Sequence, residues 1–118
     1  MDLKTVSDLI PMARTDGDAL VVSVRGEIDL HNSPEFRTEL LDLVVKHPSK
    51  RLILNLSQVP YMDSSACAVL LEALRRVRAV AGKMYLAAVQ PRVKSLLEIA
   101  RLETIFILVP DEADALKK

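Results

Sequence analysis

The feature that most constrains this chain is the junction at Asp63-Ser64-Ser65, where a strand pattern passes directly into a helix pattern. In the short apolar run 52–56 before it, Leu52-Ile53-Leu54 is apolar without alternation, which is typical of a strand covered on both faces. A hydroxyl at such a junction faces unpaired backbone N–H groups and the positive end of the helix dipole. The junction therefore predicts an α/β fold, and it puts Ser64 where a phosphate is favoured. The helix after it is indicated by Val69, Leu70, Leu74, Val77 and Ala81, which recur at helical spacing.

Strand and helix patterns alternate along the whole chain, and this alternation predicts a single α/β domain over residues 1–118. We expect a mixed, mostly parallel sheet of about five strands with about four helices, gathered on one face. An Asp16-Gly17 turn predicts an N-terminal hairpin whose first strand, interrupted by Pro11, lies at the sheet edge. The expected strands lie at 6–14, 19–24, 51–56, 84–89 and 105–109, and the expected helices begin near residues 33, 64, 91 and 111.

Three details of the helices follow from local sequence signals. Asn32 or Ser33 is expected to cap the first helix. Gly82 stands where it can end the second helix in a left-handed conformation. Glu72 and Arg76 lie four residues apart on the polar face of that helix, a spacing that favours an ion pair.

Composition limits both the core and the partners. Only 3% of the 118 residues are aromatic and none is Trp, so the core has to be built from aliphatic side chains. The 16 basic and 16 acidic residues give a net charge of zero, which argues against direct contact with nucleic acid because such binding depends on neutralising phosphates. Arg75, Arg76 and Arg78 form a basic helix face, but no aromatic residues interleave with them for base stacking.

Cysteine content and hydropathy bear on where the protein works. A single Cys excludes an internal disulfide and suits a reducing compartment. The segment from Met1 to Val6 has no apolar stretch of the kind found in signal peptides. No apolar run approaches the roughly 20 residues needed to span a bilayer. We therefore expect a cytoplasmic protein with no membrane insertion.

Two polar loops, 26–32 and 60–65, each follow a strand pattern. Sites in α/β folds favour the carboxyl ends of strands, so these loops lie side by side if their strands are neighbours. That placement brings Glu27 and Asp29 close to Asp63 and makes the surroundings of Ser64 acidic. A plainer interpretation stays open: the Asp-Ser-Ser motif serves only as a helix cap, and the acidic residues are solvated.

Catalysis is the rival interpretation of the same residues. His31 with Asp63 and Ser64 has the composition of a hydrolase triad, but the sequence has no nucleophile-elbow glycine pattern. Three glycines form no phosphate-binding loop, and two His with one Cys make no metal site. Cys67 is either a thiol with a lowered pKa near the helix start or a small buried side chain. We expect a binding module without catalysis, metal or cofactor.

Five segments of the chain form a pattern shared with a known family: Gly26-Glu27-Ile28-Asp29, Leu54-Asn55-Leu56, Met62-Asp63-Ser64-Ser65, Gly82-Lys83-Met84 and Pro91-Arg92-Val93-Lys94. Over nearly the whole chain this pattern resembles the STAS domain of bacterial anti-sigma factor antagonists. The chain departs from the family at Ala66 and Cys67, where Gly and Leu are usual, and at Arg101, where Gly is frequent.

The resemblance implies a partner-switching function. Such proteins bind an anti-sigma factor that is also a serine kinase of the histidine-kinase-like ATPase fold. That partner phosphorylates the first Ser of the motif, here Ser64, which releases the complex, and a metal-dependent serine phosphatase removes the phosphate. An alternative with the same fold is an adaptor subunit of a lipid-transport ABC complex or of a stress-sensing scaffold. The family's contact surface maps onto Glu27, Asp29, Asp63, Ser64, Ser65 and Ala66.

Overall fold

Five strands form one mixed sheet in the computed structural model, which describes residues 7–117. Their spatial order, β1-β2-β3-β4-β5, is the same as their order in the chain. β1 pairs antiparallel with β2, and the other neighbouring strands are parallel. The predicted sheet with its N-terminal edge hairpin is therefore confirmed. The strands are β1 (Met12–Asp16), β2 (Ala19–Arg25), β3 (Arg51–Gln58), β4 (Lys83–Ala87) and β5 (Ile107–Val109).

The first strand starts later than its sequence pattern suggests. β1 begins at Met12, directly after Pro11, and the apolar Leu9 and Ile10 are buried without belonging to it. Proline cannot donate a ladder hydrogen bond, so the strand starts only after the chain has passed it. Val6, the expected first residue of this strand, lies outside the described residues together with the rest of the segment from Met1.

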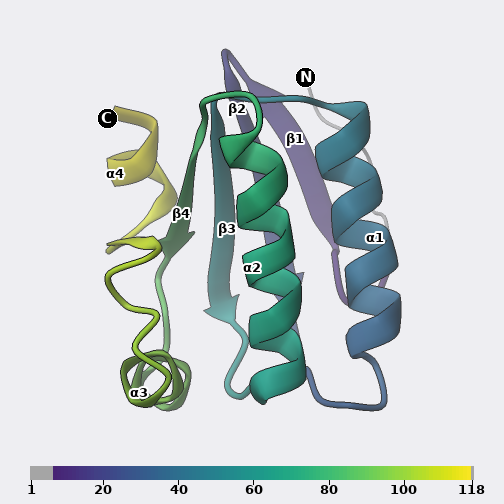
Figure 1. The fold of residues 1–118 in the computed structure, drawn as a ribbon, viewed down its shortest axis with the longest axis vertical. Coiled ribbons are helices and arrows are strands. Elements are labelled where there is room, and N and C mark those ends of the chain that lie inside the picture. Colours follow the sequence, from purple (N-terminus) through teal and green to yellow (C-terminus); the bar gives the residue numbers. More distant parts are fainter. Residues whose placement is uncertain (1–6, 118) are drawn as a thin grey trace.

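Four helices cover the sheet unequally. α1 (Ser33–Lys46) and α2 (Ser64–Arg78) lie side by side across one face, and α3 (Pro91–Ile99) joins the same core (Figure 1). α4 (Glu112–Lys117) instead packs Ala115 against the opposite face. The expectation that all helices gather on one face is therefore wrong, because α4 covers apolar residues that point away from the other three. The residues that α4 covers include Ala19, Val21, Ile53, Tyr85 and Ala87.

Within residues 7–117, no helix is long and apolar enough to cross a bilayer.

The core between the sheet and α1 and α2 is largely aliphatic, as the composition predicts. Alternate residues of β2 and β3 point into it, and Leu20, Val22, Leu52 and Leu54 are each no more than 1% exposed. Burying one such side chain contributes roughly 1.5–3 kcal/mol. This packing holds the carboxyl ends of β2 and β3 in a fixed relation to the start of α2.

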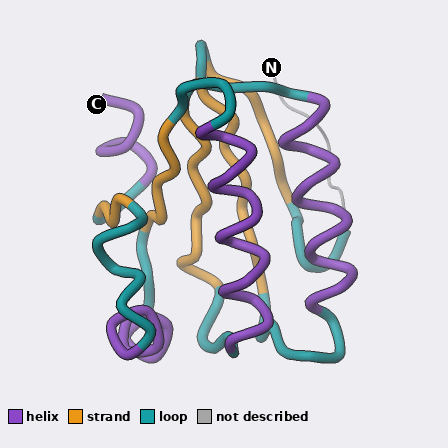
Figure 2. The backbone as a smooth tube through the Cα atoms, viewed as in Figure 1, coloured by secondary structure: helices purple, strands orange, loops and turns teal. Residues whose placement is uncertain are grey.

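The loops that follow β2 and β3 meet at one edge of the sheet. Both lie at the lower end of the molecule in Figure 2, below α1 and α2. An isolated parallel bridge between Ile28 and Met62 joins them. The predicted side-by-side placement of the two polar loops is therefore confirmed.

The end of α2 differs from the expectation. Ala81, and not Gly82, takes the left-handed conformation, with φ of 60°. The Gly82 N–H donates to the Val77 carbonyl oxygen at 2.9 Å and the Ala81 N–H to that of Arg78 at 3.0 Å, which closes the helix as a Schellman motif does. Gly82 is required for space instead, because a Cβ there would lie 2.8 Å from a Val77 methyl and 2.9 Å from the Lys50 carbonyl oxygen.

The polar contact between α1 and α2 also differs from the expectation. Arg37 of α1 donates two hydrogen bonds to the Glu72 carboxylate, at 2.8 and 2.6 Å, and these raise the pKa of Arg37 and lower that of Glu72. The predicted ion pair between Glu72 and Arg76 does not form, because the Arg37 fork engages both carboxylate oxygens. Arg76 is left without a hydrogen bond or salt bridge within residues 7–117.

Polar contacts hold α4 on the sheet at both of its ends. The Glu112 carboxylate accepts hydrogen bonds from Arg14 at 3.0 Å and from Asn55 at 2.7 Å. Arg51 donates to two carbonyl oxygens of the last turn, at 3.1 and 2.7 Å. These carbonyl groups have no partner within the helix, so Arg51 satisfies them.

Candidate functional site

Asp63 starts α2 and organises the junction. Its Oδ1 atom accepts hydrogen bonds from the N–H groups of Ser65 at 2.9 Å and Ala66 at 3.4 Å, and from the Ser65 hydroxyl. The backbone of Asp63 is extended, with φ −109° and ψ −172°, and this conformation brings the carboxylate over the first turn. The arrangement is an N-terminal helix cap, and it satisfies donors that the helix itself cannot.

The same contacts lower the pKa of Asp63. The hydrogen bond from the Ser65 hydroxyl is the largest cause, and the N–H groups of Ser65, Ala66 and Leu30 add to it, while burial opposes it. The folded protein therefore favours the ionised carboxylate. A fixed negative charge stands next to Ser64 in the chain at neutral pH.

Asp63→Asn tests this assignment through the pH dependence of stability. Because the pKa of Asp63 is lower in the folded chain, its contribution to the free energy of unfolding is present above the unfolded pKa and is lost as pH falls through the folded pKa. Asn caps a helix about as well as Asp, so the variant should be at least as stable as the wild type in acid. It should lose part of the rise in stability toward neutral pH. Urea unfolding of the variant and the wild type from acid to neutral pH measures the free energy of unfolding of each. An equal change of this free energy with pH in the two proteins would contradict the assignment.

Ser64 and Ser65 have different surroundings. Ser64 is the first residue of α2 and is exposed, and its hydroxyl has no hydrogen-bond partner in the described part of the chain. Ser65 is half-buried and its hydroxyl donates to Asp63. Ser65 is therefore engaged in the cap, whereas the Ser64 hydroxyl can react without breaking a contact.

The loop after β2 is joined to the junction by backbone hydrogen bonds. The Ile28 N–H donates to the Tyr61 carbonyl oxygen, and the Asp63 N–H donates to that of Ile28, each at 3.1 Å. Ile28 itself is fully buried. The loop that carries Glu27 and Asp29 is thereby held against the residues that start α2, so the acidic residues predicted for the site belong to two loops in contact.

Asn32 braces this loop from within. Its side-chain oxygen accepts a hydrogen bond from the Asp29 N–H at 2.9 Å, and its side-chain nitrogen donates to the Glu27 carbonyl oxygen at 2.9 Å. Asn32 occupies the cap position of α1, as predicted, but its side chain makes no capping hydrogen bond there. Its contribution is to fix the loop that presents the acidic residues.

The structure adds Leu30, which the sequence pattern did not single out. Ile28 and Leu30 are both apolar residues in a polar loop, but Ile28 is 0% exposed and Leu30 is 73% exposed. The Leu30 N–H contributes to the lowered pKa of Asp63, so Leu30 lies beside the junction. A large apolar side chain held in solvent by a braced loop is suited to anchor a partner.

Ala66 and Cys67 face inward. They are 0% and 5% exposed, so Ala66 shapes the first turn of α2 and offers no surface of its own. Burial raises the pKa of the Cys67 thiol, and the Asp63 charge adds to this effect. The interpretation of Cys67 as a thiol with a lowered pKa is therefore wrong, and a small buried side chain is what the structure contains.

His31 is paired within its own loop. Its Nδ1 atom lies 3.5 Å from the Asp29 carboxylate, and its side chain is 96% exposed. Among the described residues, no three His, Cys, Asp or Glu side chains are grouped so that they could hold a metal ion. The feature of the site that can do chemistry is the exposed Ser64 hydroxyl.

Comparison with known proteins extends this picture. The STAS domain family model matches residues 10–115. The anti-sigma F factor antagonist of Paenibacillus polymyxa is 29% identical over 97 residues, which cover 82% of this chain and 83% of that protein. The crystal structure of an anti-sigma factor antagonist from Mycobacterium paratuberculosis has a TM-score of 0.79 at 25% identity, and the match covers 89% of this chain and 88% of that one.

A further solved structure shares the fold alone. The Bacillus cell fate determinant SpoIIAA, in its phosphorylated form, has a TM-score of 0.67 at 22% identity, and the match covers 89% of this chain and 95% of that one. The same protein in its unphosphorylated form has a TM-score of 0.66. The STAS domain model matches residues 10–115, a range that includes all five strands, and the chain therefore belongs to the STAS domain family.

Proposed function

We propose that this protein is an anti-sigma factor antagonist that is switched off by phosphorylation of Ser64. In its unphosphorylated form it binds an anti-sigma factor that is also a serine kinase of the histidine-kinase-like ATPase fold. A serine phosphatase restores the binding form. The observation that carries the proposal is the exposed Ser64 hydroxyl, without a partner in the described chain, at the start of α2. Relatives named as anti-sigma factor antagonists, and a structural neighbour solved in a phosphorylated form, support it.

The proposed contact surface combines both loops at this edge of the sheet. Glu27 and Asp29 come from the loop after β2, and Asp63, Ser64 and Ser65 come from the start of α2. Ala66 belongs to this surface only as the buried residue that sets the first turn. The protein acts by binding and not by catalysis, in the cytoplasm, where its kinase and phosphatase work.

A phosphate on Ser64 acts locally. It adds about −1.5 to −2 charges at pH 7. The N–H groups of Ser65 and Ala66 already donate to Asp63, so it is the dipole at the start of α2 that favours the added charge, and the fold is preserved. A partner surface matched to a neutral hydroxyl is instead repelled, because the new charge adds to the charge of Asp63.

A pull-down from the native cytosol tests the proposal. Wild-type protein should retain a serine-kinase anti-sigma factor, and added ATP should increase its intact mass by one phosphate located on Ser64. Ser64→Ala should retain the same partner and gain no phosphate. Retention of a membrane transporter complex by both proteins, without any phosphate, would support the adaptor alternative and contradict the proposal.

Leu30→Ala should weaken binding of the anti-sigma factor about tenfold, because a well-placed apolar anchor contributes more than about 1 kcal/mol to binding. The stability of the variant should not change, since Leu30 is 73% exposed. Ile99→Ala on α3 is the matched control, because Ile99 is 82% exposed and lies outside both loops. Calorimetric titration of the three proteins measures the difference. Equal loss of affinity in both variants would show that Leu30 has no special role.

A further inference from the structure

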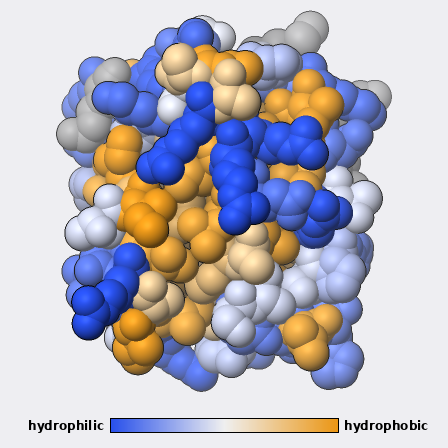
Figure 3. Space-filling model, viewed as in Figure 1, coloured by the Kyte–Doolittle hydropathy of each residue, from blue (hydrophilic) through white to orange (hydrophobic). Residues whose placement is uncertain are grey.

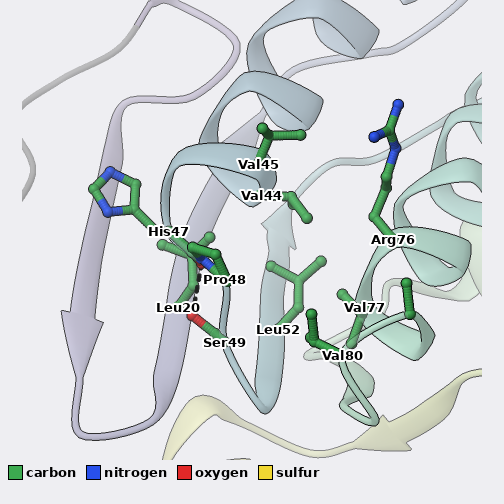
Figure 4. Close-up of a pocket in the computed structure, with 11 residues that line it drawn as sticks. Leu20, Val44, Val45, His47, Pro48, Ser49, Leu52, Arg76, Val77 and Val80 are labelled. Atoms are coloured by element: carbon green, nitrogen blue, oxygen red, sulfur yellow. Dashed lines mark hydrogen bonds between the residues drawn. The ribbon is translucent and has the colours of Figure 1, made fainter.

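An apolar pocket lies at the edge of the sheet opposite Ser64, between the ends of α1 and α2 (Figure 4). Its volume is about 200 Å³. Leu20 and Leu52, each 1% exposed, are the most deeply buried of its lining residues. Val45 and Val80 in its wall remain 55% and 38% exposed, so apolar surface continues from the pocket to solvent. The other aliphatic lining residues are Val44, Pro48, Val77 and Ala79.

Three carbonyl oxygens around the pocket already accept hydrogen bonds. Lys50 Nζ donates to the Val80 carbonyl oxygen at 2.6 Å, and the Ser49 hydroxyl donates to that of His47 at 2.8 Å. The Val77 carbonyl oxygen accepts from the N–H group of Gly82 at 2.9 Å. The negative ends of the two helix dipoles are therefore partly compensated.

Arg76 is the polar lining residue that stands apart. Glu72 is the acidic residue of α2, and its carboxylate accepts two hydrogen bonds from Arg37. Asp42 on α1 forms a salt bridge with Lys46 at 3.1 Å. Arg76 has no hydrogen bond or salt bridge among the described residues. Its guanidinium stands on the α2 side of the pocket, across from Val45 (Figure 4). Hydrophilic side chains and apolar surface meet at this end of the two helices (Figure 3).

We propose that this pocket binds a small aliphatic carboxylate. The aliphatic tail would displace water from the surface formed by Leu20, Leu52 and the surrounding valines, and Arg76 would donate a bidentate pair of hydrogen bonds to the carboxylate. An Arg fork matches the planar geometry of a carboxylate. Arg76 acts on Glu72 through its charge, but it has no hydrogen bond or salt bridge among the described residues to give up. The site lies at the far end of α2 from Ser64, so its existence does not depend on the proposed partner-switching function.

The size of the pocket limits the ligand. Pockets for drug-sized ligands are roughly 300–1,000 Å³, and this one is about 200 Å³. One short aliphatic chain therefore fits, and a diacyl lipid does not. Hexanoate is a suitable probe, with hexan-1-ol and hexylammonium as the neutral and cationic molecules of similar shape.

Methyl NMR titration tests the proposal. Hexanoate should shift the methyl signals of Leu20, Val44, Leu52, Val77 and Val80, and hexan-1-ol and hexylammonium should bind more weakly. Arg76→Gln should lower the hexanoate affinity at least about fivefold and make hexanoate and hexan-1-ol equivalent. Arg75→Gln, one residue away and exposed, is the matched control and should leave the affinity unchanged.

A second variant tests the apolar half of the site. Val80→Thr keeps the side-chain shape but replaces one methyl group with a hydroxyl, so it should weaken the binding of hexanoate and of hexan-1-ol to the same extent. The proposal is overturned if millimolar hexanoate shifts none of the pocket methyl signals. It is also overturned if hexanoate and hexan-1-ol bind the wild type equally, or if Arg75→Gln and Arg76→Gln have the same effect.

Discussion

Ser64→Asp should reduce the affinity for the anti-sigma factor by about a hundredfold or more, whereas Ser64→Ala should keep the affinity of the wild type. Placing like charges together at an interface costs several kcal/mol, and about 3 kcal/mol already exceeds a hundredfold in affinity. Asp63 supplies the first charge, because its capping contacts lower its pKa and keep it ionised. The carboxylate introduced by the substitution would add a second charge at the adjacent, exposed position.

The loss of affinity should occur without loss of the fold. A carboxylate in the first turn of a helix is stabilised by roughly 0.3–1 kcal/mol through the helix dipole. Ser64 makes no hydrogen bond within the described chain that the substitution would break. The thermal unfolding midpoint of Ser64→Asp should therefore equal or slightly exceed that of the wild type, so reduced binding cannot be attributed to unfolding.

Calorimetric titration with the anti-sigma factor measures the effect, and Ser95→Asp is the matched control. Ser95 is also an exposed serine on a helix, but it lies within α3 and not at a junction. The effect of Ser64→Asp should shrink as salt is raised, since exposed charges are screened. If Ser64→Asp binds as tightly as Ser64→Ala, the switch does not act through charge at this position.

The junction could be predicted from the sequence because its structure is decided locally. An apolar strand run, an Asp that can cap, and a helix pattern follow one another within a few residues, and the structure has β3, the Asp63 cap and α2 in that order. The sequence left open whether the two strands before the polar loops are neighbours, and the structure pairs β2 with β3. The loop contact between Ile28 and Met62 is a consequence of that pairing.

Features decided by contacts between distant segments could not be read from local patterns. Glu72 has Arg76 at a suitable helical spacing, yet it binds Arg37 because α1 packs against α2 and offers a bidentate partner. α4 lies on the opposite face of the sheet because Arg14, Arg51 and Asn55 hold it there. The exposure of Leu30, two residues from the buried Ile28, likewise depends on how the loop is seated.

Gly82 shows the same distinction at a single residue. A glycine just after a helix predicts a left-handed C-terminal residue, but Ala81 has that conformation, with φ of 60°. What excludes a side chain at Gly82 is the chain segment before β3, whose Ser49 and Lys50 carbonyl oxygens would each lie 2.9 Å from a Cβ. The glycine is thus required by the packing of two loops and not by the conformation of its own backbone.

Gly82→Ala should therefore destabilise the protein by about 1–3 kcal/mol, as overpacking of a tight contact does. The backbone oxygens cannot turn aside as a flexible side chain could, and the Val77 methyl, 2.8 Å from the added Cβ, belongs to a buried residue. Urea unfolding of the variant and the wild type measures the loss. A change within a few tenths of a kcal/mol would mean that the 49–50 segment yields easily.

Ala81→Gly is the matched control, because it changes the adjacent residue in the opposite sense. Ala81 holds a positive φ that glycine adopts without strain, so this variant should be stabilised by up to about 1 kcal/mol. Opposite signs for the two substitutions would locate the strain at Ala81 and the steric limit at Gly82. If Gly82→Ala were neutral and Ala81→Gly destabilising, α2 would end in a different geometry from the one described. The positions of Val77 and Val80 in the wall of the adjoining pocket would then differ as well.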